Sequence, residues 1–236
     1  RWMLDGDLIA INKPAGFPVH PGSGYAGGTC IDRILEHLGH VRSSGTFAPA
    51  LLHRLDADTS GVLVTAKTYR ALRGLSKEFS HRRVEKRYRA LAGGAPVPDE
   101  GRIDLPVTRL ANPQRAREDL QGVTDYRVVA RAARPDLAAG GWPMHLALLD
   151  LQILTGRTHQ IRSHLKSIGA PVIGDTLYGA PPANEAAKRD TGLKRQFLHA
   201  ARLVFTHPVN GLEVVVEAPL PPDLRGTLDF LGMPAG

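Results

Sequence analysis

The chain has 236 residues, of which 42% are hydrophobic and 22% charged, so it is long and apolar enough to form a globular domain with a buried core. It contains no run of about 18 apolar residues and a single cysteine, Cys30, which excludes a membrane-spanning helix and an internal disulfide. The formal net charge is +7, and residues 70–89 alone hold eight Lys and Arg against two Glu. Such a segment is typical of a surface that binds a polyanion, although a solvated helix face gives the same pattern.

The first half of the chain alternates apolar runs with turn signals. Residues 8–11 predict a buried strand, which the Asn-Lys-Pro-Ala-Gly turn ends. After a Gly/Pro-rich loop, apolar residues at helical spacing predict a helix over residues 31–38. Residues 62–65 predict a strand, residues 72–79 a helix whose other faces are basic, and residues 88–92 a further strand.

The second half is richer in strands than in helices. Residues 95–122 predict short strands or a long hairpin, and residues 180–196 an exposed loop or short helix. A helix is predicted over residues 158–168, with Ile161, Leu165 and Ile168 as its buried stripe. Strands are predicted at residues 126–129, 146–154, 202–205 and 212–216. Because strands outnumber helices and do not alternate regularly with them, the pattern favours an α+β fold with a mixed, largely antiparallel sheet over a doubly wound one.

The most distinctive stretch is HRLDADTSG, residues 53–61, which places two carboxylates, an arginine and a histidine between two apolar runs. We expect Asp56 to lie where a strand gives way to a turn formed by Thr59, Ser60 and Gly61. Its backbone would then be fixed while its carboxylate reaches a cleft. From the residues alone Asp56 is a candidate nucleophile, metal ligand, general base or cap, and Asp58 is a candidate structural residue that bonds within the turn.

Other motifs are misleading. Residues 22–27 fit the dinucleotide-binding pattern GxGxxG, but Pro18 and Pro21 interrupt any preceding strand and no acidic residue follows at the required distance. Asp56 and Asp58 also resemble the DxD of aspartyl phosphatases, but those have Thr or Val where this chain has Ser60, and they require a later acidic pair for magnesium. The adjacent acidic pairs of this chain, at residues 99–100 and 118–119, lie in a loop and in a basic stretch and do not suit that role. The glycine of residues 58–61 comes one place late for an aspartic protease. The scattered histidines form no zinc-binding pair.

Further motifs accompany HRLDADTSG. They are NKPAG at residues 12–16, EKRY at 85–88, TGRTHQIR at 155–162 and PVIGDTLYG at 171–179. Together, in this order between about residues 5 and 217, they resemble the RluA-type pseudouridine synthase family. The HPGSG stretch at residues 20–24 and the length of the 95–122 segment are most similar to the members that act on large-subunit ribosomal RNA.

The resemblance implies an isomerase that converts uridine to pseudouridine within RNA, without cofactor or metal. The uracil is detached from C1′, turned, and rejoined through C5. The implied fold is the pseudouridine synthase catalytic fold, an α+β sheet with flanking helices around a central RNA-binding cleft. We therefore expect an RNA partner, with ribosomal RNA first and transfer RNA as the alternative within the same family.

Four residues take their roles from the resemblance. Asp56 is the nucleophile, in attack on the sugar or in glycal formation, and Arg162 pairs with its carboxylate. An adjacent arginine would keep the pKa of that carboxylate low and aim its oxygens. Tyr88 stacks on the flipped uracil and is a candidate base, since its ring is flat and apolar with a polar tip. Ile161 forms part of the wall of the uracil pocket.

Further substrate-binding candidates are basic or lie within these motifs. Arg54, beside Asp56, would anchor a phosphate or brace the loop, and the basic segment would follow the RNA phosphates. Asp175 is interpreted as a carboxylate that braces its loop. The remaining candidates are Arg73, Lys77, Arg83, Lys86, Arg157 and His159.

Several alternatives remain open. An RNA-binding module without turnover would show the same charge, and an aspartyl phosphatase would be silenced by a chelator. The absence of a visible signal peptide and the single cysteine favour the cytoplasm, and a monomer is the default expectation. We interpret residues 1–236 as the catalytic domain, and we expect that a small N-terminal RNA-binding domain of the S4 type is missing from it.

Overall fold

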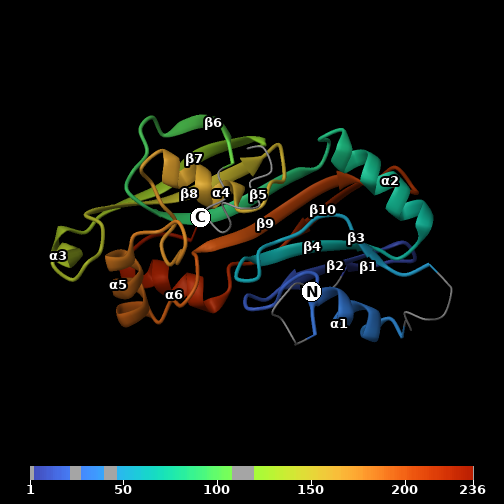
Figure 1. The fold of residues 1–236 in the computed structure, drawn as a ribbon, viewed down its shortest axis with the longest axis horizontal. Helices are drawn as coiled ribbons and strands as arrows, with labels where there is room; N and C mark the ends of the chain where they lie inside the picture. The colour runs from blue at the N-terminus through green and yellow to red at the C-terminus, as the bar shows by residue number, and fades with distance from the viewer. Residues whose placement is uncertain (1–2, 22–27, 40–46, 108–119, 236) are drawn as a thin grey trace, which may run out of the picture. The chain divides into compact units, whose positions relative to one another are not determined.

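The structure is a computed structural model that describes residues 3–21, 28–39, 47–107 and 120–235. The GxGxxG stretch therefore lies outside the described residues. The chain divides into two compact units, one formed by Arg1–Lys86 with Ala200–Ala218 and the other by Arg87–His199 with Pro219–Gly236. Each unit combines helices with strands, and the α+β class with a mostly antiparallel sheet is confirmed (Figure 1). No helix in the described ranges is long and apolar enough to cross a membrane.

The first unit is built on strands β2 and β4, which pair antiparallel along their whole length and are almost completely buried. Helix α2 packs on β4 with Ala71 and Leu75, whose neighbours include Val62 and Val64. Thr68 begins this helix by accepting a hydrogen bond from the backbone N–H of Ala71. The elements are β1 (Met3–Leu4), β2 (Leu8–Lys13), α1 (Cys30–His37), β3 (Ala50–Leu51), β4 (Ser60–Ala66), α2 (Tyr69–Ser80), most of β9 (Leu198–Thr206), and β10 (Glu213–Glu217).

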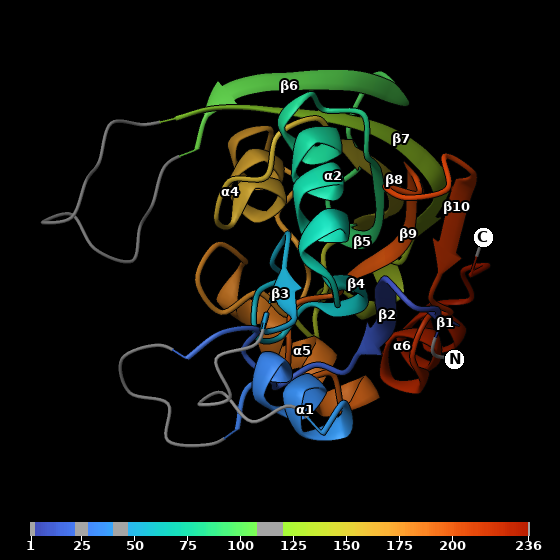
Figure 2. The same cartoon turned by 90° about the vertical axis from the view of Figure 1, so that its right-hand side faces the viewer.

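The second unit is built on a four-stranded antiparallel sheet in the order β5-β8-β7-β6. Strand β8, one of the two inner strands, is buried on both faces through Leu148, Leu149 and Leu151. This burial explains its continuous apolar run. Helix α4 packs on β7, and α5 packs on α6 (Figure 2). The elements are β5 (Glu85–Gly93), β6 (Glu100–Pro106), β7 (Gln121–Ala133), α3 (Pro135–Ala138), β8 (His145–Ile153), α4 (Gln160–Ser167), α5 (Pro181–Thr191) and α6 (Pro222–Leu231).

One sequence prediction in this part of the fold was right only in part, and another was wrong. Of the two alternatives for residues 180–196 the helix is correct: α5 has eleven residues, and it is not simply exposed, because Ala183, Ala186 and Ala187 form a small buried apolar face. Ile168 does not belong to the buried stripe of α4: the helix ends at Ser167 and Ile168 is 37% exposed.

Candidate active site

A buried lysine holds the loop that carries Asp56. Lys13, at the end of β2, is 0% exposed. Its Nζ donates hydrogen bonds to the carbonyl oxygens of Pro14 at 2.9 Å, Phe17 at 2.8 Å and Ala57 at 2.7 Å. Because Ala57 follows Asp56 directly, this ammonium fixes the backbone beside the candidate nucleophile. Three carbonyl acceptors are also what an ammonium needs in order to be buried.

His53 holds the other end of the same loop. Its Nε2 accepts the backbone N–H of Val64 at 3.0 Å, so the imidazole takes the place of a strand carbonyl just beyond β3. Its ring stacks on Phe79 of α2 with centroids 5.4 Å apart. Burial, with the nearby charge of Lys86, lowers the pKa of His53 to about 4, which keeps the acceptor nitrogen unprotonated at neutral pH.

Lys86 lies at the edge of this cluster, with its Nζ 6.0 Å from the Phe79 ring centroid. Burial lowers the pKa of Lys86 to about 8, and the charge of Arg82 contributes. Lys86 therefore remains mostly charged at neutral pH. It is a cation held next to aromatic rings in the same unit as Asp56.

The position of the turn in HRLDADTSG differs from the prediction. The turn lies at Ala57 and Asp58, with the N–H of Thr59 bonded to the carbonyl of Asp56 at 3.1 Å, and Ser60 already begins β4. Gly61 is required within the strand because its φ is +118° and a Cβ there would meet the backbone of Ala200. Gly61 is therefore needed for the close approach of two strands and not for a turn. Asp56 is half-buried, whereas Asp58 is exposed.

The second unit contains a buried ion pair centred on Arg162. Its Nε and Nη2 donate to the two carboxylate oxygens of Asp175 at 2.6 and 2.8 Å, and both side chains are almost fully buried. Asp175 also accepts the backbone N–H groups of Leu177 and Tyr178. Burial by itself would raise the pKa of Asp175, but the bond from Arg162 and the two backbone N–H groups outweigh it and lower the pKa. The interpretation of Asp175 as a loop-bracing carboxylate is confirmed.

Tyr178 links Arg162 to His159. The guanidinium carbon of Arg162 lies 5.2 Å from the centroid of the Tyr178 ring, within the range of a cation–π contact. The Tyr178 hydroxyl lies 3.3 Å from Nδ1 of His159, and the two rings meet edge-to-face. His159 has φ +59°, a left-handed conformation that is uncommon for a side-chain-bearing residue, and it precedes the first residue of helix α4.

Gln160 fastens the TGRTHQIR motif to strand β7. Its Oε1 accepts from the Thr155 hydroxyl and from the N–H of Arg157, while its Nε2 donates to the Val123 carbonyl and the Thr124 hydroxyl. All four hydrogen-bonding positions of this buried amide are thereby used. The start of helix α4, and with it Ile161 and Arg162, is fixed relative to the sheet of its own unit.

Comparison with known proteins agrees with these features. Residues 7–167 match the model of the RNA pseudouridylate synthase family. The chain belongs to this family. It is 36% identical over 230 residues to ribosomal large subunit pseudouridine synthase D of Zymomonas mobilis, covering 94% of this chain and 69% of that protein. The protein of the same name from Nitrosomonas europaea is 38% identical, with 96% and 63% covered. Human RNA pseudouridylate synthase domain containing 4 has a similar structure, with a TM-score of 0.72, 26% identity, and 98% and 92% covered.

The chain is thus an RNA pseudouridine synthase of the RluA type, as the motifs predicted. Within the first unit the structure brings together the Asp56 loop, Lys13, His53 and Lys86. Within the second it brings together Arg162 and His159, through Tyr178. Tyr88 in β5 and Ile161 in α4 are 7% and 5% exposed, so both side chains are buried within that unit.

The basic candidates are not all equally available to RNA. Arg54 and Arg157 are exposed, as are Arg73 and Lys77 on α2. Arg83 is exposed as well, but its guanidinium donates to both carboxylate oxygens of Glu78. Any phosphate at Arg83 must therefore compete with that carboxylate.

Sequence reasoning missed two residues that contact the candidate site residues. Lys13 was part of the NKPAG motif but had no role assigned. A lysine closing an apolar strand before Pro and Gly was the available signal. Tyr178 stood in the GDTLYG stretch, yet only the structure shows that its ring lies against Arg162. Neither the contact of Lys13 with Ala57 nor that of Tyr178 with Arg162 follows from a sequence period, because each joins residues that are distant in the chain or separated by a loop.

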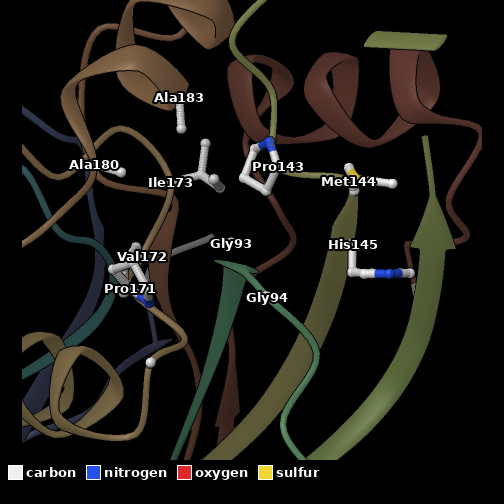
Figure 3. A pocket seen from close by; sticks show the side chains of 11 residues that line it. Gly93, Gly94, Pro143, Met144, His145, Pro171, Val172, Ile173, Ala180 and Ala183 are labelled. Atoms are coloured by element: carbon white, nitrogen blue, oxygen red, sulfur yellow. The ribbon is translucent and has the colours of Figure 1, made fainter. Parts of the chain in front are cut away.

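A cavity of about 380 Å³ in the second unit is separate from these residues. It lies at the Gly93 end of β5, and Figure 3 shows Ile173 and Pro143 facing it. Its lining is almost entirely carbon, with His145 as the titratable group, and none of the predicted site residues contributes to it. Its lining contains no Lys or Arg, so it offers no cation to the phosphates of an RNA backbone.

Proposed function

We propose that this pseudouridine synthase modifies large-subunit ribosomal RNA, and that Asp56 is the carboxylate that attacks the target uridine. Support for the substrate comes from the relatives of Zymomonas mobilis and Nitrosomonas europaea, both named for the large ribosomal subunit. Support for Asp56 comes from its loop: the backbone is held through Lys13 and His53, while the Asp56 side chain is only half-buried. A fixed backbone with an accessible carboxylate is what nucleophilic catalysis requires.

The reaction is an isomerisation, so its atoms balance without a co-reactant. The bond between C1′ and N1 breaks with the help of Asp56, either by attack on C1′ or by formation of a glycal. The freed uracil turns and forms a bond from C5 to C1′. The hydrogen on C5 then leaves as a proton, and N1 gains one.

Tyr88 and Arg162 are the proposed partners in this reaction. Tyr88 offers a buried ring on which the flipped uracil stacks, and its hydroxyl is the candidate base for the C5 proton. Arg162 is the proposed ion-pair partner of the Asp56 carboxylate. A guanidinium has five N–H donors, so the two bonds to Asp175 orient Arg162 and still allow a second carboxylate to bind.

The substrate is tested by the loss of the C5 hydrogen. Unmodified transcripts of 23S ribosomal RNA and of transfer RNAs, each labelled with tritium at C5 of uracil, are incubated with the chain. We expect tritium release from the ribosomal transcript and none from transfer RNA. Release from transfer RNA alone would show that the substrate class is wrong while the enzyme class is right.

The nucleophile is tested with a matched pair of variants. Asp56→Asn keeps the shape and hydrogen-bonding reach of the side chain but removes its charge and nucleophilic oxygen. It should fold, bind RNA and release no tritium, because no neighbouring group replaces the carboxylate. Asp58→Asn, in the same turn but exposed, should retain turnover. The reverse pair of results would assign the reaction to Asp58.

The proposal also places the enzyme in the cytoplasm, where a chain with one cysteine and an RNA substrate is expected. It treats the working form as a monomer. Sedimentation of the purified chain with and without RNA measures this directly, and a stable dimer would contradict it.

A further inference from the structure

The most exposed large aromatic residue among those the structure describes is Tyr69, at 61%. It is the first residue of helix α2, in the same unit as Asp56. Phe47 meets its ring edge-on with centroids 6.1 Å apart, and the guanidinium carbon of Arg73 lies 6.0 Å from its centroid. These neighbours contact the ring without burying it, so most of Tyr69 remains open to solvent.

The residues on both sides of Tyr69 are anchored to one carboxylate. The Thr68 hydroxyl donates to Asp7, and Arg70 donates to both oxygens of Asp7 from Nε and Nη2. Asp7 itself is 7% exposed. The backbone at Tyr69 is therefore held rigidly while its ring points outward, and a rigid flat ring loses little entropy when it binds.

Tyr69 also begins a basic stripe. Residues four apart lie on the same face of a helix, which places Tyr69, Arg73 and Lys77 in one exposed row along α2. Within the part of the chain that the structure describes, no carboxylate forms an ion pair with Arg73 or Lys77. An open aromatic ring followed by uncompensated cations is the combination that single-stranded nucleic acid recognises, because bases stack while phosphates take the charge.

We propose that Tyr69 is a stacking platform for an unpaired base of the RNA substrate, separate from the base that reacts, with Arg73 and Lys77 binding the phosphates beside it. The site requires RNA as the ligand, which the family supplies. It does not depend on ribosomal RNA as the substrate or on Asp56 as the nucleophile, so it can fail or hold independently of the proposed function. Phe47 widens the apolar surface that a base would cover.

The test compares two single strands that differ only in their bases. One is a ten-nucleotide oligouridylate and the other is a strand of the same length built from abasic sugar–phosphate units. Tyr69→Ala should weaken binding of the oligouridylate about five- to 150-fold, the range found when a stacking residue is truncated. It should leave binding of the abasic strand unchanged. Tyr69→Trp should keep the affinity, and its added indole fluorescence should be quenched by oligouridylate but not by the abasic strand.

Matched controls separate stacking from other effects. Leu212→Ala truncates another exposed apolar residue of the same unit, 66% exposed, and should alter neither affinity. Arg73→Gln should weaken both strands alike, since it removes a phosphate contact. Equal losses on the two strands for Tyr69→Ala would mean that Tyr69 only supports Arg73, and no loss on either would mean that no base binds there. Each of these results would overturn the proposal.

Discussion

Tyr88 is 7% exposed within strand β5, so its ring position is set by the strand and not by the substrate. Tyr88→Phe keeps the ring and removes the hydroxyl. If the hydroxyl accepts the C5 proton, this variant should bind RNA normally and lose turnover by about 10² or more. Single-turnover tritium release measures the rate, and RNA binding is measured separately. A near-normal rate would leave Tyr88 as a stacking surface only.

The buried Nζ of Lys13 donates three hydrogen bonds to backbone carbonyl oxygens. Lys13→Met fills the same space but leaves the carbonyls of Pro14, Phe17 and Ala57 without their charged donor. The free energy of unfolding should fall by about 3 kcal/mol, because buried acceptors lose a charge-assisted partner. Chemical denaturation measures this loss.

The same variant also tests what Lys13 does for turnover. At a temperature where Lys13→Met is still folded, tritium release should fall further than RNA binding, because the Asp56 loop has lost its anchor. A folded variant with full turnover would show that Lys13 serves stability alone.

At the scale of elements, the loop between β3 and β4 should make stability depend on pH. The folded chain keeps His53 neutral down to its pKa of about 4, whereas the unfolded chain protonates it near 6.5. A lowered folded-state pKa contributes stability that is fully present above pH 6.5 and is lost as the pH falls to about 4. The loss should amount to about 3 kcal/mol at most.

His53→Gln isolates this contribution. Glutamine keeps an acceptor for the Val64 N–H but has no proton to gain. Burial also lowers the pKa of His164. The stability that His164 loses in acid is therefore the same in the wild type and in the variant. Denaturant titrations at pH 7 and pH 4.5 should show a smaller drop for the variant. Identical drops would mean that His53 is not neutral in the folded state.

The regular elements were largely predictable because their patterns are local. The strand at residues 8–11 and the helix at 72–79 were found, since buried residues recur with periods that the sequence displays. Helix α6, Pro222–Leu231, was missed, and α5 was underestimated. In α5 the buried face is alanine, which a search for large apolar residues does not register.

In the candidate site, the sequence motifs predicted individual residues but not the contacts between them. Arg162 was expected to turn inward, and at 6% exposure it does. Its partner Asp175 is thirteen residues further along the chain, beyond a helix end, and no periodicity links the two. The sequence likewise favoured a turn at Thr59–Gly61, because Thr-Ser-Gly is turn-like. The strand there exists because β4 needs a glycine where it approaches the backbone of Ala200.

At the scale of the whole molecule, ion pairing decides which cations of residues 70–89 are available to bind RNA. Residues 70–89 hold eight cations, but Arg70 pairs with Asp7, Arg83 with Glu78, and Arg87 and Arg89 with Asp150. Arg73, Lys77, Arg82 and Lys86 form no such pair within the described residues. Four of the eight cations therefore form no ion pair within the described residues, while Arg87 and Arg89 share the single carboxylate of Asp150 with Arg127 and keep part of their positive charge uncompensated.

Salt dependence distinguishes these two groups of cations. Each phosphate contact releases condensed counterions, so removing it should lower the slope of log affinity against log salt by about one unit. The double variant Arg73→Gln/Lys77→Gln should therefore weaken RNA binding and reduce the slope by about two. The matched variant Glu78→Gln/Arg83→Gln removes one charge of each sign from the same helix and the turn after it. It should leave the slope unchanged, because Arg83 is already paired with Glu78. Filter binding of a 23S transcript between about 50 and 200 mM salt, a range over which such contacts change affinity strongly, resolves the difference. Equal slopes for both double variants would mean that the exposed row on α2 is solvated and does not touch RNA.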